Sequence, residues 1–215
     1  VPAALIGVDV SVLLDNASDT KKAFFADSRQ MCDIAYLLSY VADQYVAYTD
    51  EGSGMPGLSD WIEQLVAEST GKNQVGRLPV VAETSHNGRE GNAFTIAFAG
   101  NADLVVEGDL ASQFIVWEWV TALVGAALAI DPFNQPNVTE AKEKTGALLE
   151  RWRGNGVHNP EPAFETSAIT VFSDSKAQSL TDYLRSAISH HNGYIALMAY
   201  LHRGVDDDVM QLRDL

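Results

Sequence analysis

Short apolar runs alternate with amphipathic stretches along most of the chain, and this alternation predicts strands followed by helices. Runs rich in β-branched and aromatic residues are expected to be strands, at 44–49, 77–83, 93–100, 103–108, 168–173 and 194–201. Helical spacing of apolar residues predicts helices at 1–15, 19–40, 59–69, 110–129, 138–154 and 176–189, with a last helix beginning near 206. Because strands that alternate with helices and are apolar throughout are typical of a buried parallel sheet, the pattern predicts an α/β fold.

Polar, Gly and Pro residues set the expected boundaries of these elements. A polar group between 15 and 19 is expected to separate the first two helices. Ser59 is placed to cap the helix that follows it, and Gly71 is placed to end that helix. The segments between helices and strands are rich in Gly, Pro and Ser and are expected to be turns or loops.

The order of the elements favours one lobe over residues 1–215, in which a mainly parallel sheet is flanked by helices in a three-layer sandwich. The N-terminal helical segment 1–40 is expected to pack on this lobe. In sheets of this kind ligands bind beyond the carboxyl ends of the strands, beside helix N-termini. We therefore expect a ligand site at that edge.

One segment, 114–130, is apolar apart from Glu118 and Thr121. Its length is near the lower limit for crossing a membrane, and a carboxylate near its middle costs about 3 kcal/mol there. We expect instead a helix that is buried on nearly all sides of a soluble core, in which Glu118 needs a partner. Glu118 is interpreted as a core carboxylate that bridges helices, and the alternative is a second acid near a functional site.

The balance of charge limits the partners of the chain. Its 215 residues carry 29 Asp and Glu against 14 Lys and Arg, a net charge of −15. Nucleic acid and anionic membranes both require a basic surface, so neither is expected as a general partner. The single cysteine, Cys32, excludes a disulfide framework and fits a reducing cytosol, so we expect a cytoplasmic protein. Cys32 lies in the apolar context QMCDIAYLL and is expected to be a small buried hydrophobe.

The sequence does not match several familiar nucleotide-binding and metal-binding motifs. The Gly-Lys pair at 71–72 lacks the Gly that a phosphate loop needs at 66 and the Ser or Thr that it needs at 73. No G-x-G-x-x-G opens a helix after a strand. The five histidines do not pair with Cys or carboxylates at ligand spacing, so a metal site is not expected. No organic cofactor is indicated either.

Glu68, in the stretch AESTGK, would by itself be an ordinary solvated carboxylate near a helix end. A second stretch, FNQPNVTEAK at 133–142, changes this interpretation. It follows the apolar helix, places Gln135 in a proline-containing turn and places Lys142 in the first turns of the next helix. From that helix alone, Lys142 would be a surface lysine paired with a neighbouring glutamate.

The two stretches resemble segments of the phosphoglucose isomerase family, whose lobes have the sugar-isomerase (SIS) fold, a flavodoxin-type α/β arrangement. QLVAESTGK at 64–72 is similar to the pattern Q-L-x-x-E-S-x-G-K around the family's catalytic glutamate. FNQPNVTEAK is similar to its C-terminal signature, F-D-Q-x-G-V-E-x-x-K. The Q-P-N form is most similar to the isomerase half of bacterial transaldolase–phosphoglucose isomerase fusions, and the resemblance runs over most of the chain.

The resemblance implies interconversion of glucose 6-phosphate and fructose 6-phosphate through a cis-enediol, without metal or cofactor. Glu68 would be the base that moves a proton between C2 and C1. Gln135 would bind the substrate, and Lys142 would contact the sugar near the ring oxygen or the phosphate. A carboxylate suits both proton transfers, and an ammonium stabilises the negative charge that develops between them.

The chain departs from the family pattern at Asn134, at Pro136–Asn137 and at Thr139, which alter the turn. It lacks the family's Gly-Gly-Arg-x-Ser segment, and it has no match for the ring-opening histidine, a role to which His86 is not assigned. Both ends of the chain look cut. We therefore expect the second SIS lobe of a larger enzyme, with the first lobe and, in a fusion protein, a transaldolase domain as its partners.

Two alternatives remain open. One is a non-catalytic SIS module that binds a phosphosugar, and the other is a lobe that is inert without its partner lobe. If Glu68 and Lys142 share one cleft, the enzyme is favoured, whereas a Glu68 that faces bulk solvent favours the binding module.

Overall fold

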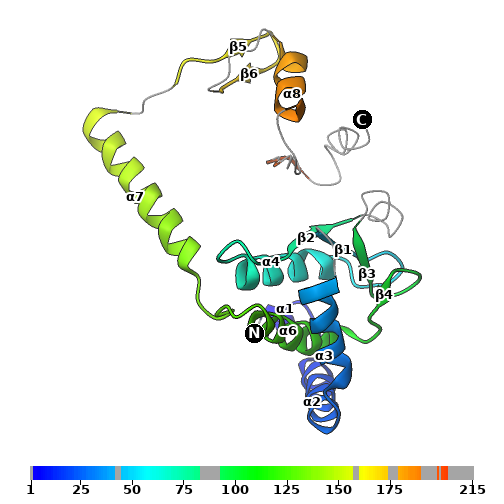
Figure 1. Cartoon of the computed structure of the whole chain (residues 1–215). Coiled ribbons are helices and arrows are strands. Elements are labelled where there is room, and N and C mark those ends of the chain that lie inside the picture. The colour runs from blue at the N-terminus through cyan, green and yellow to red at the C-terminus, as the bar shows by residue number, and fades with distance from the viewer. Residues whose placement is uncertain are drawn as a thin grey trace. The chain divides into compact units, whose positions relative to one another are not determined.

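A computed structural model of the chain describes residues 2–41, 45–82, 93–156, 160–173, 179–189, 198 and 200–202. The chain divides into two compact units, Val1–Thr145 and Gly146–Leu215 (Figure 1). The first unit contains a parallel sheet with the helices that pack on it, and the second contains a short hairpin and a helix.

The first unit is built on a four-stranded sheet whose strands are all parallel (Figure 1). The strands are β1 (Tyr45–Thr49), β2 (Leu78–Val81), β3 (Phe94–Ala97) and β4 (Leu104–Val105), in the order β2-β1-β3-β4. All four lie within segments that the sequence predicts to be strands. The predicted α/β class, with a parallel sheet flanked by helices, is thus confirmed.

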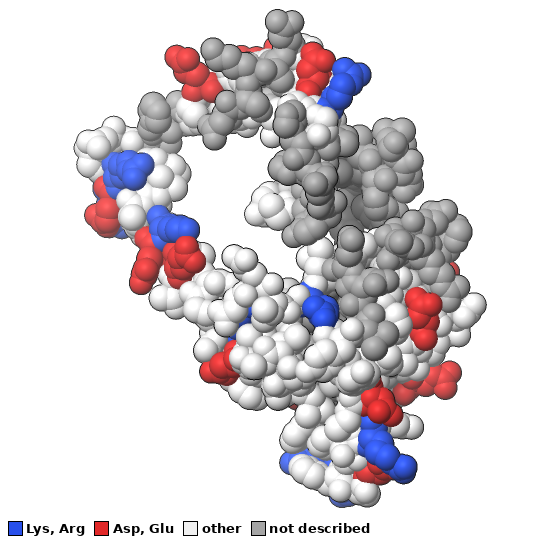
Figure 2. All heavy atoms as spheres, viewed as in Figure 1, with Lys and Arg blue, Asp and Glu red and all other residues white. Residues whose placement is uncertain are grey.

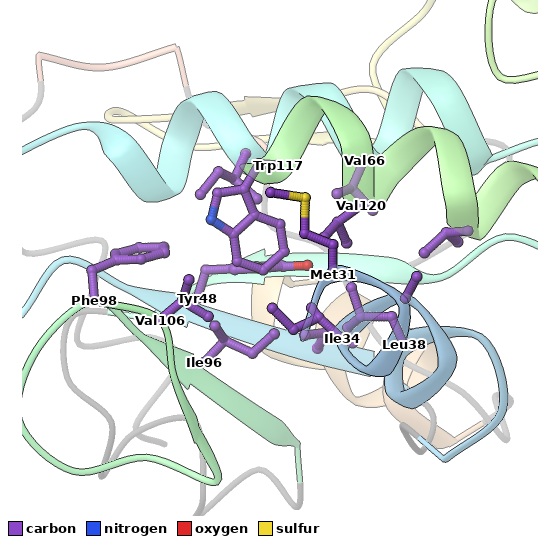
Figure 3. Packing of buried hydrophobic residues seen from close by; sticks show 14 of the residues in the cluster. Met31, Ile34, Leu38, Tyr48, Val66, Ile96, Phe98, Val106, Trp117 and Val120 are labelled. Carbon is purple, nitrogen blue, oxygen red and sulfur yellow. The ribbon is translucent and has the colours of Figure 1, made fainter. Parts of the chain in front are cut away.

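The core of this unit lies between one face of the sheet and three helices (Figure 3). These helices are α3 (Arg29–Tyr36), α4 (Leu58–Thr70) and α6 (Leu110–Ala127). Trp117 of α6 meets Tyr48 of β1 edge to face, with ring centroids 5.4 Å apart, and both side chains are fully buried. Because fully burying one large apolar side chain contributes about 1.5–3 kcal/mol, this layer is the main source of stability that the described residues offer.

The N-terminal helices break at other places than predicted. They are α1 (Pro2–Leu5), α2 (Val10–Ala26), α3 and a π-helical segment, η1 (Leu37–Val41). Residues 15–19 lie inside α2, so the predicted break there is wrong. α2 begins after Asp9, whose carboxylate accepts hydrogen bonds from the backbone N–H of Ser11 and Val12 at 3.0 and 3.2 Å. Both α2 and α3 pack on α6.

Cys32 is exposed, so the expectation that it is buried is wrong. α3 turns Met31, Ile34 and Ala35 toward the core. Cys32 follows Met31 by one position, and a helix places such a neighbour about 100° around its axis. The apolar letters around Cys32 in the sequence therefore did not determine its burial.

α4 begins in a different way from the one predicted. Its N-cap is Gly57, in a left-handed conformation with φ of 89°, and Ser59 lies inside the first turn. The cap is supplied by Asp50, directly after β1. Its carboxylate accepts hydrogen bonds from the N–H of Gly57 at 2.6 Å, from the N–H of Ser59 at 2.7 Å and from the Ser59 hydroxyl at 2.6 Å. The predicted cap at Ser59 is therefore wrong, whereas Gly71 ends α4 as expected.

Among the described residues, α6 is the one helix long and apolar enough to cross a membrane, and 39% of its apolar window is buried. It contacts α2, α3 and α4, which makes it the central helix of the unit. Glu118 is exposed, so the expectation that the helix is buried on nearly all sides, with Glu118 as a core carboxylate, is wrong. Trp117, Thr121 and Val124 face the core, and Glu118 lies on another side of the helix.

α7 (Pro136–Asn155) corresponds to the predicted helix 138–154 and begins at the second proline of the preceding turn, a position that proline favours. It crosses the boundary between the two units, and none of its residues is buried.

The second unit contains a β-hairpin followed by a helix. Its elements are β5 (Phe164–Glu165), β6 (Thr170–Val171) and α8 (Leu180–Ser189). β5 pairs antiparallel with β6 in a segment predicted to be a loop. β6 and α8 lie within a predicted strand and a predicted helix. The predicted strand 194–201 and the predicted last helix lie largely or wholly outside the described residues.

Candidate functional site

Glu68 lies at the amino edge of the sheet. α4 leaves the carboxyl end of β1 and leads to the amino end of β2, so it runs opposite to the strands (Figure 1). Its last turn, which carries Glu68, therefore lies at the amino edge rather than at the carboxyl edge where a ligand was expected. At the carboxyl edge, the N–H groups at the N-terminus of α4 donate to the Asp50 carboxylate. Asp50 therefore occupies the place at the helix N-terminus where an anionic ligand would bind.

The turn that follows α6 reaches the end of α4. α6 closes with two hydrogen bonds of the Schellman type, from Ile130 N–H to the Gly125 carbonyl at 3.0 Å and from Ala129 N–H to the Ala126 carbonyl at 3.2 Å. Pro132 then packs on the helix end, because a Cβ placed on Gly125 would lie 2.7 Å from Pro132 Cγ. Gly125 is thus what allows the proline turn to fold back against α6.

The Glu68 carboxylate faces two side-chain amides. Gln135 Nε2 donates to Glu68 Oε2 at 3.4 Å, and Gln64 Nε2, one helical turn before Glu68, donates to Oε1 at 3.4 Å. Both distances are at the long end of the hydrogen-bonding range, so the contacts are loose. The structure therefore brings together two of the residues that the sequence selects, Glu68 and Gln135, from segments 67 positions apart.

Three further hydrogen bonds, made by the side chains of Lys72 and Asn137, join residues 71–72 to residues 131–137. Lys72 Nζ donates to the main-chain carbonyl of Asp131 at 2.7 Å and to that of Asn134. Asn137 Nδ2 donates to the carbonyl of Gly71 at 3.2 Å. The end of the stretch QLVAESTGK is thus in contact with the beginning of the stretch FNQPNVTEAK.

Lys142 is not part of this contact. It is exposed on α7 and makes no hydrogen bond or ion pair with any residue that the structure describes. Nor does it form the neighbouring ion pair that the helix alone suggests, because Glu140 pairs with Lys144 at 2.6 Å. Of the three predicted site residues, the structure joins Glu68 to Gln135 and leaves Lys142 apart.

Glu68 and Gln135 are both exposed, so the described residues leave them open to water. A solvated carboxylate flanked by two amides can bind hydroxyl groups of a ligand, since carboxylates accept and amides both donate and accept. Proton abstraction from carbon would require a ligand to exclude that water, because desolvation strengthens the electrostatic interactions of such a site.

Lys72 is the residue near the site whose position the sequence did not indicate. The Gly-Lys pair at 71–72 does not complete a phosphate loop and matches the end of the family pattern, but nothing local predicts that the lysine is buried. Its exposure is 6%. The only signal in the sequence is its place after a helix-ending glycine, where a cation interacts favourably with the helix dipole.

The described residues form no metal site, and the face drawn in Figure 2 shows no basic patch. No group of three or more His, Cys, Asp and Glu in the described part of the chain could hold a metal ion. In Figure 2 the described charged side chains on the visible face are scattered, without a continuous basic area. Four of the five histidines, including His86, lie outside the described residues.

Comparison of the chain with protein-family models found no match, and comparison with curated proteins found none either.

Proposed function

We propose that the chain is the aldose–ketose isomerase lobe of a cytoplasmic glucose-6-phosphate isomerase. In this proposal its fold is a three-layer, SIS-like lobe, the second of a larger enzyme that also supplies a first lobe and, in a fusion protein, a transaldolase domain. The observation that carries the proposal is the contact between Glu68 and Gln135. It joins the two sequence segments on which the resemblance to the phosphoglucose isomerase family rests.

In the proposed reaction Glu68 removes the proton from C2 of the open-chain aldose phosphate. The C–H electrons form the C1=C2 double bond of the cis-enediol, and the carbonyl oxygen at C1 takes a proton from water and becomes a hydroxyl. Glu68 then returns its proton to C1, while the C2 hydroxyl gives its proton back to water and becomes the ketone. One carboxylate can serve both steps because C1 and C2 are adjacent.

The other two predicted residues have supporting roles in the proposal. Gln135 binds substrate hydroxyls beside the carboxylate, and its amide holds the base at the same time. Lys142 neutralises charge near the ring oxygen or the phosphate. For this it needs the bound sugar to bridge to it, because it makes no contact with Glu68 or Gln135.

A non-catalytic phosphosugar-binding module is the second candidate, and two observations favour it. Glu68 is exposed to solvent and has no cationic partner among the described residues, and Lys142 makes no contact with it. A solvated carboxylate of this kind can accept hydrogen bonds from the hydroxyl groups of a sugar without acting as a base. A lobe that is inert without its partner lobe is the third possibility, and only the full-length parent protein distinguishes it.

The test is a coupled assay of fructose 6-phosphate conversion, carried out on the full-length parent with Glu68→Gln as the variant. We expect kcat to fall by about 10²–10⁴-fold, the contribution of a positioned general base, with a much smaller change in KM. Glu161→Gln is the matched control, since it makes the same change at an exposed carboxylate of the second unit. Unchanged turnover in Glu68→Gln would remove the assignment of the base.

A binding measurement separates the candidates. Calorimetric titration of fructose 6-phosphate into the parent and into the 215-residue chain reports affinity without requiring turnover. Binding without conversion in the parent supports the module. Conversion by the parent, with neither binding nor conversion by the chain alone, supports the inert lobe.

A further inference from the structure

The buried amine of Lys72 has an unusual set of partners. The side chain is 6% exposed, and the partners that hold its Nζ are main-chain carbonyls, those of Asp131 and Asn134. A buried ammonium group is costly unless hydrogen bonds compensate for the lost water. Neither partner here is a carboxylate, so the contact fixes the path of the backbone rather than forming an ion pair.

The two carbonyls bracket the proline turn that leads to the candidate site. Asn134 directly precedes Gln135, whose amide lies 3.4 Å from the Glu68 carboxylate. Lys72 itself stands four positions after Glu68 in the sequence, just beyond the end of α4. One amine therefore connects the helix that carries the carboxylate with the peptide that carries the amide.

The rest of the turn is held against α6 but not against Glu68. Pro132 packs on Gly125, which fixes the start of the turn on the helix it leaves. The Asn137 amide reaches Gly71 from the far side of Gln135, but this contact is exposed and 3.2 Å long. Of the described contacts between the turn and the end of α4, those of Lys72 are partly buried, whereas those of Gln135 and Asn137 are exposed.

We propose that Lys72 is a positioning residue of the site: by holding the carbonyls of Asp131 and Asn134, it places the Gln135 amide beside the Glu68 carboxylate. The effect of Lys72 on catalysis rests on the proposed isomerase function. Its effect on the conformation of the turn is independent of that function. Lys72 touches no substrate in this role. It acts through Gln135.

The chain offers a matched control in Arg77. Its guanidinium also donates to two main-chain carbonyls, that of Leu38 at 2.6 Å and that of Ser39, and it lies on the same connection between α4 and β2. It holds η1 rather than the proline turn. Arg77→Met thus removes the same type of contact without touching the site.

The first measurement is hydrogen exchange followed by mass spectrometry on the 215-residue chain. The described hydrogen-bonded amide within 131–135 is that of Phe133, whose N–H donates to the Asp131 carboxylate at 2.9 Å. In Lys72→Met we expect exchange in this segment to accelerate by about tenfold at Phe133, as a local closing contact is lost. Arg77→Met should leave that segment unchanged and accelerate exchange in η1. Lys72→Arg, which keeps a cation, should give an intermediate rate and remains informative if Lys72→Met fails to fold. Unchanged exchange at 131–135 in both Lys72 variants would overturn the proposal.

The second measurement is a double-mutant cycle in the full-length parent, with kcat/KM for fructose 6-phosphate as the readout. If Lys72 acts through Gln135, the pair Lys72→Met and Gln135→Ala loses no more activity than the larger single effect. Multiplied losses would show that Lys72 acts by another route. A parent that lacks isomerase activity would instead defeat the proposed function, and the exchange experiment would still decide the role of Lys72.

Discussion

Tyr48 brings a hydroxyl group into an apolar interior. The side chain is fully buried against Trp117, and within the described part of the chain its oxygen has no hydrogen-bond partner. A buried polar group without a partner costs free energy, so the ring contributes by packing and the hydroxyl opposes it. Burial also raises the pKa of the Tyr48 phenol well above its ordinary value, because the interior disfavours the phenolate.

This shift predicts a loss of stability at high pH. Above about pH 10 the phenol ionises in the unfolded chain while it stays protonated in the folded one, so the unfolded state binds fewer protons. The free energy of unfolding should then fall with rising pH by up to about 1.4 kcal/mol per pH unit from this one group. Urea unfolding of the chain and of Tyr48→Phe between pH 8 and pH 11 measures the difference. Tyr36→Phe, at an exposed ring, is the control.

If Tyr48→Phe and the unaltered chain lose stability in parallel over this range, Tyr48 ionises alike in both states and its burial is not maintained. At pH 8 the variant should differ from the chain by less than about 1 kcal/mol, because removing an unpaired buried hydroxyl is nearly neutral.

α6 ends in a Schellman turn without the glycine that usually follows a helix. Ala129 has φ of 55°, the left-handed conformation that glycine normally supplies at this position of a Schellman turn. The two hydrogen bonds of the turn and the packing of Pro132 on Gly125 hold it there. The sequence therefore contained no glycine to mark the boundary, although the predicted end at 129 was close to the observed one.

Replacing Ala129 by Gly should stabilise the chain. The left-handed conformation costs an L-residue about 1–2 kcal/mol, and glycine adopts it freely but loses more entropy on folding, so we expect a net gain of roughly 0.5–1 kcal/mol. Ala122→Gly is the matched control, since the same substitution inside α6 should cost about 1 kcal/mol. Thermal unfolding of both variants tests the pair. Destabilisation by Gly at both positions would contradict the assigned conformation of Ala129.

The buried apolar core belongs to one part of the chain. Every buried residue of the two hydrophobic clusters that the structure describes lies between 24 and 111 or on α6. All four tryptophans lie before residue 155, at 61, 117, 119 and 152. By contrast, α7 buries none of its residues.

This distribution predicts that residues 1–155 fold without the rest. The fragment keeps α7 whole and retains the complete described core, so its urea unfolding should stay cooperative, with a midpoint within about 10% of that of the full chain. Tryptophan fluorescence follows the same four residues in both proteins. A broad transition, or none, would show that residues 156–215 contribute to the stability of the first unit.

Local pattern was enough for the α/β class, for the four strands of the parallel sheet and for the helix 59–69 with its end at Gly71. These features depend on the spacing of apolar side chains and on a glycine at the helix end, and both can be recognised in short segments. Glu68 and Gln135 were selected through the resemblance of two longer segments to the phosphoglucose isomerase family. Packing between distant segments decided the rest. Asp50 caps α4 across a loop, Glu118 faces outward because other faces of α6 meet the core, and Lys72 is buried because a turn about 60 residues later closes over it. The sequence names the residues of the candidate site, but their meeting at the amino edge of the sheet follows from the opposed directions of helix and strand.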